Sequence, residues 1–429
     1  MNSKQSGRRR FLKDSAALAR FGLAGLAVGA ASPAGVARAG VLTEMQSASG
    51  LTQTSGSAMT ELDGRGFRPY GERSPFEKSV RSMPPDTPGF TPLQDFVGII
   101  TPTALHYVNS HYGVPILDPR QHRLLMHGMV DHPLIFTMED LKRLPSVSRI
   151  HFLECNDNSA ESVKTAKTVL AHGRTSCSEW TGVLLSTLLK EAGLQKGASW
   201  LVAEGADSGK HSKSIPLEKA MEDVIVAYGQ NGEPMRPENG YPLRLLIPGF
   251  AGVNNIKWLR RIKVVDQPYM QKAEAAGYAS IRPDGKARWF MFEMPPKSVI
   301  TRPSGGQQLS GPGFYEITGL AWSGRGSIRK VEVSTDGGRT WKEAQLQTPI
   351  HRIAHTRFRF NWDWGGQETT LMSRCTDDLD QIQPTLAELS KVWKVNLEYW
   401  KETTNPINVF NPIQPWKVNR DGSIQNALV

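Results

Sequence analysis

Residues 151–158 read His-Phe-Leu-Glu-Cys-Asn-Asp-Asn, and this stretch decides the fold prediction. The residues from 148 to 153 are rich in β-forming side chains, so they predict a strand. The three residues after the cysteine favour turns, so the strand is expected to end there. Cys155 would then stand where a strand gives way to a loop, held rigidly and facing a cleft. This is a position at which a thiolate metal ligand is expected.

Short strands and short helices are predicted on both sides of this stretch. Strands are expected over residues 93–102, 124–129, 200–203, 243–247 and 256–265, and helices over 136–143, 184–192 and 216–221. The helix over 184–192 is the clearest, because its leucines fall on one face. Mixed strands and helices with many loops predict an α+β domain, which we assign to residues 91–294.

The character of the chain changes near residue 295. Short strands at the spacing of a β-sandwich are predicted over residues 315–322, 328–334, 357–362 and 370–375. Residues 334–341 read Ser-Thr-Asp-Gly-Gly-Arg-Thr-Trp and predict a hairpin turn, to which we assign no chemistry. Residues 376–429 have no regular period and are expected to wrap the sandwich or meet a partner chain. The second domain is therefore assigned to 295–429, with a C-terminal extension.

The N-terminal leader carries most of the excess charge, +6 of a net +10, which makes a nucleic-acid-binding protein a poor interpretation. Arg8 and Arg9 precede a short run of small apolar residues, and Ala37-Arg38-Ala39 resembles a cleavage site. Residues 1–39 thus resemble a twin-arginine export signal, which delivers folded protein to the periplasm. A membrane anchor is the alternative, but the run is short and interrupted. Residues 40–90 predict an N-terminal arm with little core.

The chain has three cysteines, and none stands in a Cys-x-x-Cys or Cys-x-x-Cys-His motif. The sequence therefore predicts no c-type haem, iron–sulfur cluster or zinc knuckle in this chain. An odd count leaves at least one cysteine unpaired. A disulfide between Cys177 and Cys375 is left open.

A series of motifs resembles the sulfite oxidase family of molybdenum enzymes. They are, in order, HFLECxxN at 151–158, EGAD at 204–207, SIPL at 214–217, YxxNG at 228–232, YPLR at 241–244 and IKWLRR at 256–261. The segments at 105–113 and 172–180 resemble most closely SoxC, the molybdenum subunit of sulfane dehydrogenase. The resemblance covers about residues 90–420. It implies a molybdopterin-binding domain followed by an immunoglobulin-like dimerisation domain.

The resemblance also implies a cofactor and its binding residues. The family uses molybdopterin, whose molybdenum takes one protein thiolate, and by position this ligand is Cys155. The residues matching the family's cofactor site are Tyr107, Val108, Asn109, His111, Asp207, Ser214, Asn239, Arg244, Asn255, Ile256 and Lys257. Tyr278 matches the active-site tyrosine, which can assist proton transfer. Without the resemblance, Cys155 would be interpreted as a packed structural cysteine, and Arg244 and Lys257 as solvated ends of strands.

Two departures from the family pattern bear on the substrate, and a third bears on the turn after Cys155. Sulfite oxidases have an arginine at the position of Asn109, which we count among the catalytic residues, and another near Ala160 and Glu161. A pocket without these two cations should bind free sulfite poorly. Asp157 replaces a glycine or small residue, so the turn is expected to be strained if it needs a positive φ there.

These observations favour a molybdenum-dependent sulfane dehydrogenase subunit, acting on sulfur bound to a carrier protein of the SoxYZ type. Electrons would leave to a c-type cytochrome of the SoxD type, because the chain has no haem motif. A homodimer through the second domain is expected, with no nucleic acid and no membrane span after signal removal. The alternatives are a periplasmic sulfite dehydrogenase, an S-oxide reductase, or a non-catalytic binding protein with a structural Cys155.

Overall fold

The computed structural model describes residues 70–82, 89–163, 169–281, 284–402 and 409–428. Residues 74–429 form one compact unit. The predicted export signal and most of the predicted arm lie outside the described residues, and the predicted domain boundaries stay predictions. Within the described residues, we find no helix with the length and apolar character needed to cross a membrane.

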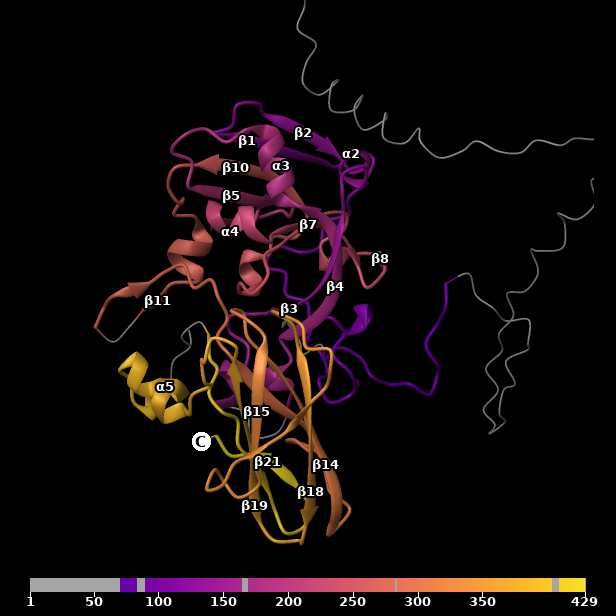
Figure 1. Cartoon of the computed structure of the whole chain (residues 1–429), viewed down its shortest axis with the longest axis vertical. Helices are drawn as coiled ribbons and strands as arrows, with labels where there is room; N and C mark the ends of the chain where they lie inside the picture. The colour runs from indigo at the N-terminus through magenta and orange to yellow at the C-terminus, as the bar shows by residue number, and fades with distance from the viewer. Residues whose placement is uncertain (1–69, 83–88, 164–168, 282–283, 403–408, 429) are drawn as a thin grey trace, which may run out of the picture. The chain divides into compact units, whose positions relative to one another are not determined.

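The first sheet of the N-terminal half has the strand order β2-β1-β10-β5-β6 (Figure 1). Its strands are β1 (Arg123–Gly128), β2 (Leu134–Thr137), β5 (Trp200–Gly205), β6 (Ser212–Pro216) and β10 (Leu259–Val265). Strands β1 and β10 run parallel, and the other neighbours pair antiparallel. Apolar residues on one face, such as Leu124 and Ile262, are fully buried against the helices, so this sheet has one core face.

The second sheet carries the cysteine loop. It contains β3 (Val147–Glu154), β4 (Thr175–Leu184), β7 (Ile225–Gln230), β8 (Glu233–Pro234) and β9 (Arg244–Leu246). Strand β3 becomes buried toward its end, and Glu154 pairs with Thr175 in the last register position before Cys155. The cysteine is therefore anchored by a complete antiparallel ladder.

Three α-helices and several short turns connect these sheets. The helices are α2 (Met138–Lys142), α3 (Leu185–Ala192) and α4 (Leu217–Glu222). The short helical turns are η1 (Thr103–Leu105), η2 (Ala160–Val163), η3 (Val169–His172), η4 (Pro237–Asn239), η5 (Gly252–Asn254) and η6 (Ala273–Gly277), followed by the hairpin β11 (Ser280–Ile281) and β12 (Ala287–Arg288). Thr137 and Asp140 form a capping box that starts α2. Gly193, with φ 70°, ends α3.

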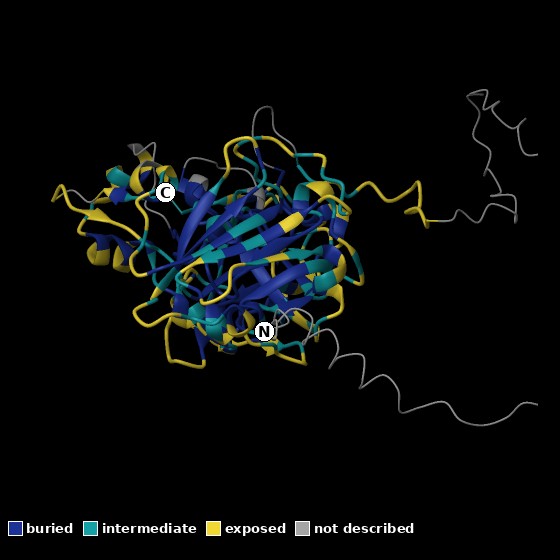
Figure 2. Cartoon of the chain, turned by 90° about the horizontal axis from the view of Figure 1, so that it is seen from above, coloured by how far each residue is buried: buried dark blue, intermediate teal, exposed yellow. Residues whose placement is uncertain are grey.

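The C-terminal half is a sandwich of two antiparallel sheets (Figure 1). One has the order β13 (Lys297–Arg302), β14 (Gly313–Trp322), β18 (Thr356–Trp364) and β17 (Gln345–Leu346). The other has the order β16 (Lys342–Glu343), β15 (Ile328–Ser334), β19 (Thr369–Asp377), β20 (Trp416–Val418) and β21 (Ile424–Asn426). The inner faces bury large side chains such as Trp322, Phe358 and Trp416. Figure 2 shows that buried residues lie inside the molecule and exposed residues mostly on its outer loops. The α+β prediction with a sandwich is confirmed.

Three predictions of secondary structure need correction. Residues 93–102 form a loop, because Gly98 takes a φ of 79° and Val97 is 84% exposed, so no strand ladder continues there. The strand expected from residue 256 begins only at Leu259, after Trp258 at φ 54°. Strand β4 was not predicted, although it forms the ladder next to Cys155.

The C-terminal extension has more regular structure than the sequence suggested. It forms α5 (Leu386–Trp393) and α6 (Leu397–Glu402), and a capping box of Thr385 and Glu388 starts α5. Its apolar residues, Trp393, Trp400 and Phe410 among them, pack on Ala160 and Val163. The Val409 amide donates to the Asn156 carbonyl at 2.7 Å. The extension therefore supplies two sandwich strands and also supports the cysteine loop.

The three cysteines are free and buried. Cys177 lies in β4 and Cys375 in β19, and each belongs to the core that the sandwich shares with its neighbours. The disulfide left open by the sequence is not formed.

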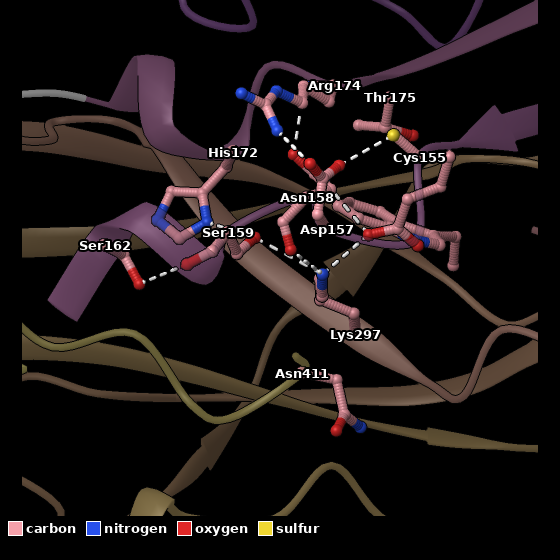
Figure 3. Close-up of polar contacts among 12 residues, drawn as sticks. Cys155, Asp157, Asn158, Ser159, Ser162, His172, Arg174, Thr175, Lys297 and Asn411 are labelled. Carbon is pink, nitrogen blue, oxygen red and sulfur yellow. Dashed lines mark hydrogen bonds and ion pairs between the residues drawn. The ribbon is translucent and has the colours of Figure 1, made fainter. Parts of the chain in front are cut away.

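A buried charge pair, whose lysine is labelled in Figure 3, joins the cysteine loop to the sandwich. The Lys297 ammonium group on β13 lies 2.6 Å from a Glu154 carboxylate oxygen, and both side chains are at most 3% exposed. The other carboxylate oxygen accepts from the Trp322 indole at 2.7 Å, and Asn158 donates to the first at 2.9 Å. Lys297 also donates to the Asn158 carbonyl at 3.3 Å. Every charge here is compensated, as burial requires.

We expect Lys297→Met to lower the free energy of unfolding by about 3–5 kcal/mol, because it leaves the Glu154 carboxylate buried without a cation. The double variant Glu154→Gln/Lys297→Met should recover part of this loss. Urea unfolding followed by tryptophan fluorescence would measure both.

The matched control is Arg329→Met, which breaks an ion pair with Asp380 whose side chains are 56% and 73% exposed. It should change stability by less than about 1 kcal/mol. A Lys297→Met variant as stable as this control would contradict the role given to the buried pair.

Candidate cofactor and substrate site

Cys155 lies at the end of β3, in the position the sequence predicted, and is 6% exposed. Its amide donates to the Arg174 carbonyl at 2.9 Å, and its carbonyl accepts from the Asn158 amide at 3.0 Å. The positive φ of this loop falls on Ser159, at 74°, and not on Asp157. The expected strain at Asp157 was therefore assigned to the wrong residue. The loop holds the Cys155 side chain in one place through its own backbone.

The sulfur of Cys155 has three polar neighbours, and the farthest is the Asn156 Oδ1 atom at 4.0 Å. Figure 3 shows Asp157 beside the sulfur. The sulfur lies 2.7 Å from the Asp157 Oδ1 atom, to which the thiol donates. The Asn109 Nδ2 atom lies 3.9 Å away on another side. Burial, and then the nearby Asp157 charge, raise the pKa of the Cys155 thiol. A bound metal reverses this preference, because metal ligation displaces the thiol proton.

A cavity opens in front of Cys155, and its wall combines apolar side chains with a few polar and charged groups, as is usual for small-molecule sites. Most of the residues that the sequence predicted as cofactor-binding or catalytic line it together. They are Tyr107, Asn109, His111, Cys155, Asp207, Asn239, Arg244, Asn255, Lys257 and Tyr278. They come from widely separated parts of the chain, so the fold gathers them into one site.

Two buried cations line the wall of the cavity. Arg244 donates to the carbonyls of Asn239 and Asn255, at 2.8 and 3.3 Å, and its Nε atom is buried without a partner. Lys257 donates to two carbonyls and to the Ser110 hydroxyl, which lies 2.7 Å away. Among the described residues, neither cation is in an ion pair. Two buried cations with free donor capacity fit a phosphate, so these residues could hold the phosphate of molybdopterin.

Burial lowers the pKa of Lys257 to about 7, with the Arg244 charge adding to the effect. It also lowers the pKa of Arg244 to about 10. A bound phosphate would oppose both shifts, because an opposite charge favours the protonated forms. The two buried cations are therefore more favourable with an anionic group bound than without one.

Tyr278 and His111 meet at the mouth of the cavity. The Tyr278 hydroxyl lies 2.6 Å from the His111 Nε2 atom. Burial, and then the Cys155 charge, raise the pKa of Tyr278, so its hydroxyl keeps its proton. Burial lowers the pKa of His111. A neutral tyrosine joined to a neutral histidine can pass a proton between the cavity and solvent.

Three predicted residues do not line the cavity. The Val108 amide donates to the Gly89 carbonyl at 2.9 Å, and Ile256 packs into the core of the first domain. The Ser214 hydroxyl contacts the backbone of Tyr269. These residues support the elements around the site.

Sequence reasoning missed other lining residues, which are His106, Ser110, Tyr112, Leu153, His211, Glu238, Gly252, Val253 and Trp258. His106 has a buried Nε2 atom without a hydrogen-bond partner. At Gly252, a Cβ atom would lie 2.4 Å from the Tyr107 hydroxyl and 3.0 Å from the Glu154 carbonyl. Only glycine fits there, although no local sequence signal indicates this.

Two family models match the chain. One describes an oxidoreductase molybdopterin binding domain and matches residues 111–273. The other describes a Mo-co oxidoreductase dimerisation domain and matches residues 288–403.

Several characterised proteins are similar in sequence. The mitochondrial sulfite oxidase of Mus musculus is 32% identical over 326 residues, which cover 70% of this chain and 59% of the relative. That of Rattus norvegicus is 29% identical over 327 residues, with coverages of 69% and 59%. A nitrate reductase [NADH] of Phaseolus vulgaris is 33% identical over 311 residues, with coverages of 64% and 35%. The matched part thus spans 59% of the length of these sulfite oxidases.

One solved structure is similar over most of its length. The sulfane dehydrogenase SoxCD from Paracoccus pantotrophus matches at 36% identity with a TM-score of 0.76, covering 83% of this chain and 95% of that chain.

The lowered pKa of Lys257 predicts a pH dependence of stability in the cofactor-free protein. Between about pH 7 and the ordinary lysine pKa of 10.5, the unfolded chain holds a proton that the folded chain has released. Raising the pH through this window therefore stabilises the folded state. We expect Lys257→Met to flatten this rise and to lower the molybdenum content of the purified protein.

Thermal unfolding of cofactor-free samples between pH 7 and 10 would measure the slope, and elemental analysis would measure the metal. Lys342→Met, on the exposed strand β16, is the control and should keep both properties. A slope that survives in Lys257→Met would assign the pH dependence to other groups.

Proposed function

Since this chain belongs to the sulfite oxidase family of molybdopterin oxidoreductases, we propose that it is a sulfane dehydrogenase subunit. In this proposal it oxidises sulfur held on a cysteine of a carrier protein. The observation that carries the proposal is the charge around Cys155. By the motif resemblance, Asn109 stands where sulfite oxidases have an arginine, and Ala160 and Glu161 stand near the position of a second one. The Asp157 carboxylate lies 2.7 Å from the sulfur. Such surroundings suit a sulfur that carries at most one negative charge better than they suit a free dianion.

Each part of the cavity has a task in this proposal. Cys155 is the thiolate ligand of molybdenum, and Arg244 and Lys257 bind the cofactor's phosphate. The bound cofactor supplies two-electron redox chemistry, because its molybdenum passes between Mo(VI) and Mo(IV). Tyr278 holds a proton on its hydroxyl oxygen, next to His111, and gives or takes it as the sulfur atom gains oxygen.

The proposed half-reaction is balanced by water and electron carriers. A carrier persulfide, R–S–S⁻, takes up three water molecules and becomes R–S–SO₃⁻. It releases six protons and six electrons, which corresponds to three two-electron cycles. We propose a c-type cytochrome of the SoxD type as the electron acceptor and a SoxYZ-type protein as the carrier. The proposal also includes a periplasmic location and a homodimer formed through the sandwich.

Sulfite oxidation is the second candidate, because the similarity to mitochondrial sulfite oxidases favours it. It differs in needing a site for a free oxyanion beside Cys155. The two cations deepest in the cavity, Arg244 and Lys257, are held by backbone carbonyls and are assigned to the cofactor. The substrate side would then depend on Asn109, a neutral donor.

We expect the exported, cofactor-loaded protein with its cytochrome to oxidise a carrier-bound persulfide with a kcat/KM at least about a hundredfold above that for free sulfite. Steady-state reduction of the cytochrome would measure both substrates. A carrier without the added sulfane atom is the control. Efficient turnover of free sulfite with no turnover of the persulfide would replace this proposal with sulfite oxidation.

Cys155→Ser should remove the thiolate-to-molybdenum absorption and nearly all turnover, because oxygen is a poor substitute for a soft thiolate. Visible spectroscopy and elemental analysis on the same sample would check this. Cys177→Ser, a second buried cysteine outside the cavity, is the control and should keep the absorption. A Cys155→Ser variant with an unchanged spectrum would rule out Cys155 as the ligand.

A further inference from the structure

Tyr278 lines two neighbouring spaces in the first domain. One is the cavity in front of Cys155. The other is a smaller space, whose lining includes Asn156, Lys213 and Glu274 beside Tyr278 itself. Tyr278 therefore borders both the proposed substrate site and a second space with two charged side chains. Neither Lys213 nor Glu274 is among the residues that match the family's cofactor site.

Lys213 and Glu274 form a buried ion pair. The Lys213 ammonium group lies 3.4 Å from the Glu274 Oε1 atom, and the two side chains are 5% and 0% exposed. The Ser214 amide donates to the same oxygen at 2.8 Å. The other oxygen, Oε2, is buried and has no hydrogen-bond partner among the described residues. The carboxylate therefore depends on Lys213 as its counter-charge, because a buried charge is costly without one.

Glu274 fastens the segment that carries Tyr278. It belongs to η6, and Tyr278 follows η6 directly. Ala275 and Gly277 are exposed, whereas Glu274 is only 2% exposed. The small exposed residues give η6 little side-chain contact with the rest of the domain. The Glu274 carboxylate, bound to the first residues of β6, supplies that contact instead.

Lys213 also contacts the Tyr278 ring. Its ammonium nitrogen lies 5.6 Å from the centre of this ring, within the range of a cation–π interaction. Its backbone is fixed, because Lys213 pairs with Ala203 inside the β5–β6 ladder. Burial lowers the pKa of Lys213, and the Glu274 charge opposes this shift. One side chain on a rigid strand thus contacts both the tyrosine ring and the carboxylate that precedes it in the chain.

We propose that the Lys213–Glu274 pair positions Tyr278 for proton transfer, by holding both its backbone segment and its ring. The inference rests on the proposed function and deepens it, because it adds two positioning residues to the proton-transfer step. The Tyr278 hydroxyl lies 2.6 Å from the His111 Nε2 atom, and this contact requires the ring to stay in place. Lys213 and Glu274 exchange no proton with the substrate and act only through Tyr278.

Removing the cation should slow turnover only while the tyrosine hydroxyl is present. Lys213→Met should lower kcat about tenfold with KM nearly unchanged, because a displaced catalytic group loses its productive geometry. Combined with Tyr278→Phe, the same substitution should change kcat by less than about twofold. The four proteins of this cycle are compared as full, cofactor-loaded chains, per molybdenum, with whichever of persulfide and sulfite the wild type oxidises.

Amide hydrogen exchange gives a second readout that needs no turnover. The Glu274 and Ala275 amides donate to the Gln271 carbonyl at 3.0 and 2.8 Å, so their exchange reports whether η6 is held. In Lys213→Met these two amides should exchange at least about tenfold faster, while those of β1 exchange as in the wild type. Glu274→Gln keeps an acceptor for the Ser214 amide and removes only the charge. It should act in the same direction with a smaller effect, and it replaces Lys213→Met if that variant does not fold.

Lys219→Met is the matched control. It removes a lysine from another largely buried pair of the same domain, 2.8 Å from Asp223, with side chains that are 13% and 10% exposed. Lys219 lines neither of the two spaces beside Tyr278. This variant should lose stability but keep kcat and the exchange rates of the Glu274 and Ala275 amides.

A merely structural role would make Lys213→Met lower kcat by the same factor with and without Tyr278→Phe, and that result would overturn the proposal. Unchanged exchange of the Glu274 and Ala275 amides would overturn it as well. Failure of the proposed function is separate. It would appear as a wild-type protein that oxidises free sulfite and not the persulfide, while the coupling between Lys213 and Tyr278 is still present.

Discussion

The buried contact between Glu154 and Lys297 is the constraint on which the site depends. Glu154 precedes the cysteine and Lys297 begins the sandwich, so the pair joins two parts of the chain 143 residues apart. Neither charge is tolerable alone in a dry interior. The cysteine loop therefore reaches its final form only when the sandwich has packed against it. The second domain supports the cofactor site through this contact. Among the described residues, it contributes none to the cavity wall.

Inside the cavity, in contrast to this pair, two cations are buried without an acidic partner among the described residues. Arg244 and Lys257 are buried with carbonyls and hydroxyls as partners, so the folded chain carries an electrostatic cost that an anion relieves. Binding of such a group and stability of the fold are consequently linked.

Local patterns in the sequence were sufficient for the strand that leads to Cys155, for the sandwich strands β14, β15, β18 and β19, and for the family. They failed where distant partners decide the outcome. The sequence around Arg174 does not say that its guanidinium group reaches Asp157, and nothing near residue 297 indicates a buried lysine. Residues 93–102 have the composition of a strand but no neighbouring strand to pair with. Ser214 and Ile256 match the family pattern, yet their side chains face the supporting structure.

The C-terminal extension has a consequence for the order of events during synthesis. The Asn156 carbonyl, next to the cysteine, is satisfied by Val409, and Trp393 and Trp400 cover the turn that follows the cysteine. These residues are translated long after the cysteine. A chain that stops before residue 393 therefore lacks the groups that complete the turn after Cys155. Synthesis of the loop and completion of its packing are in this way separated in time.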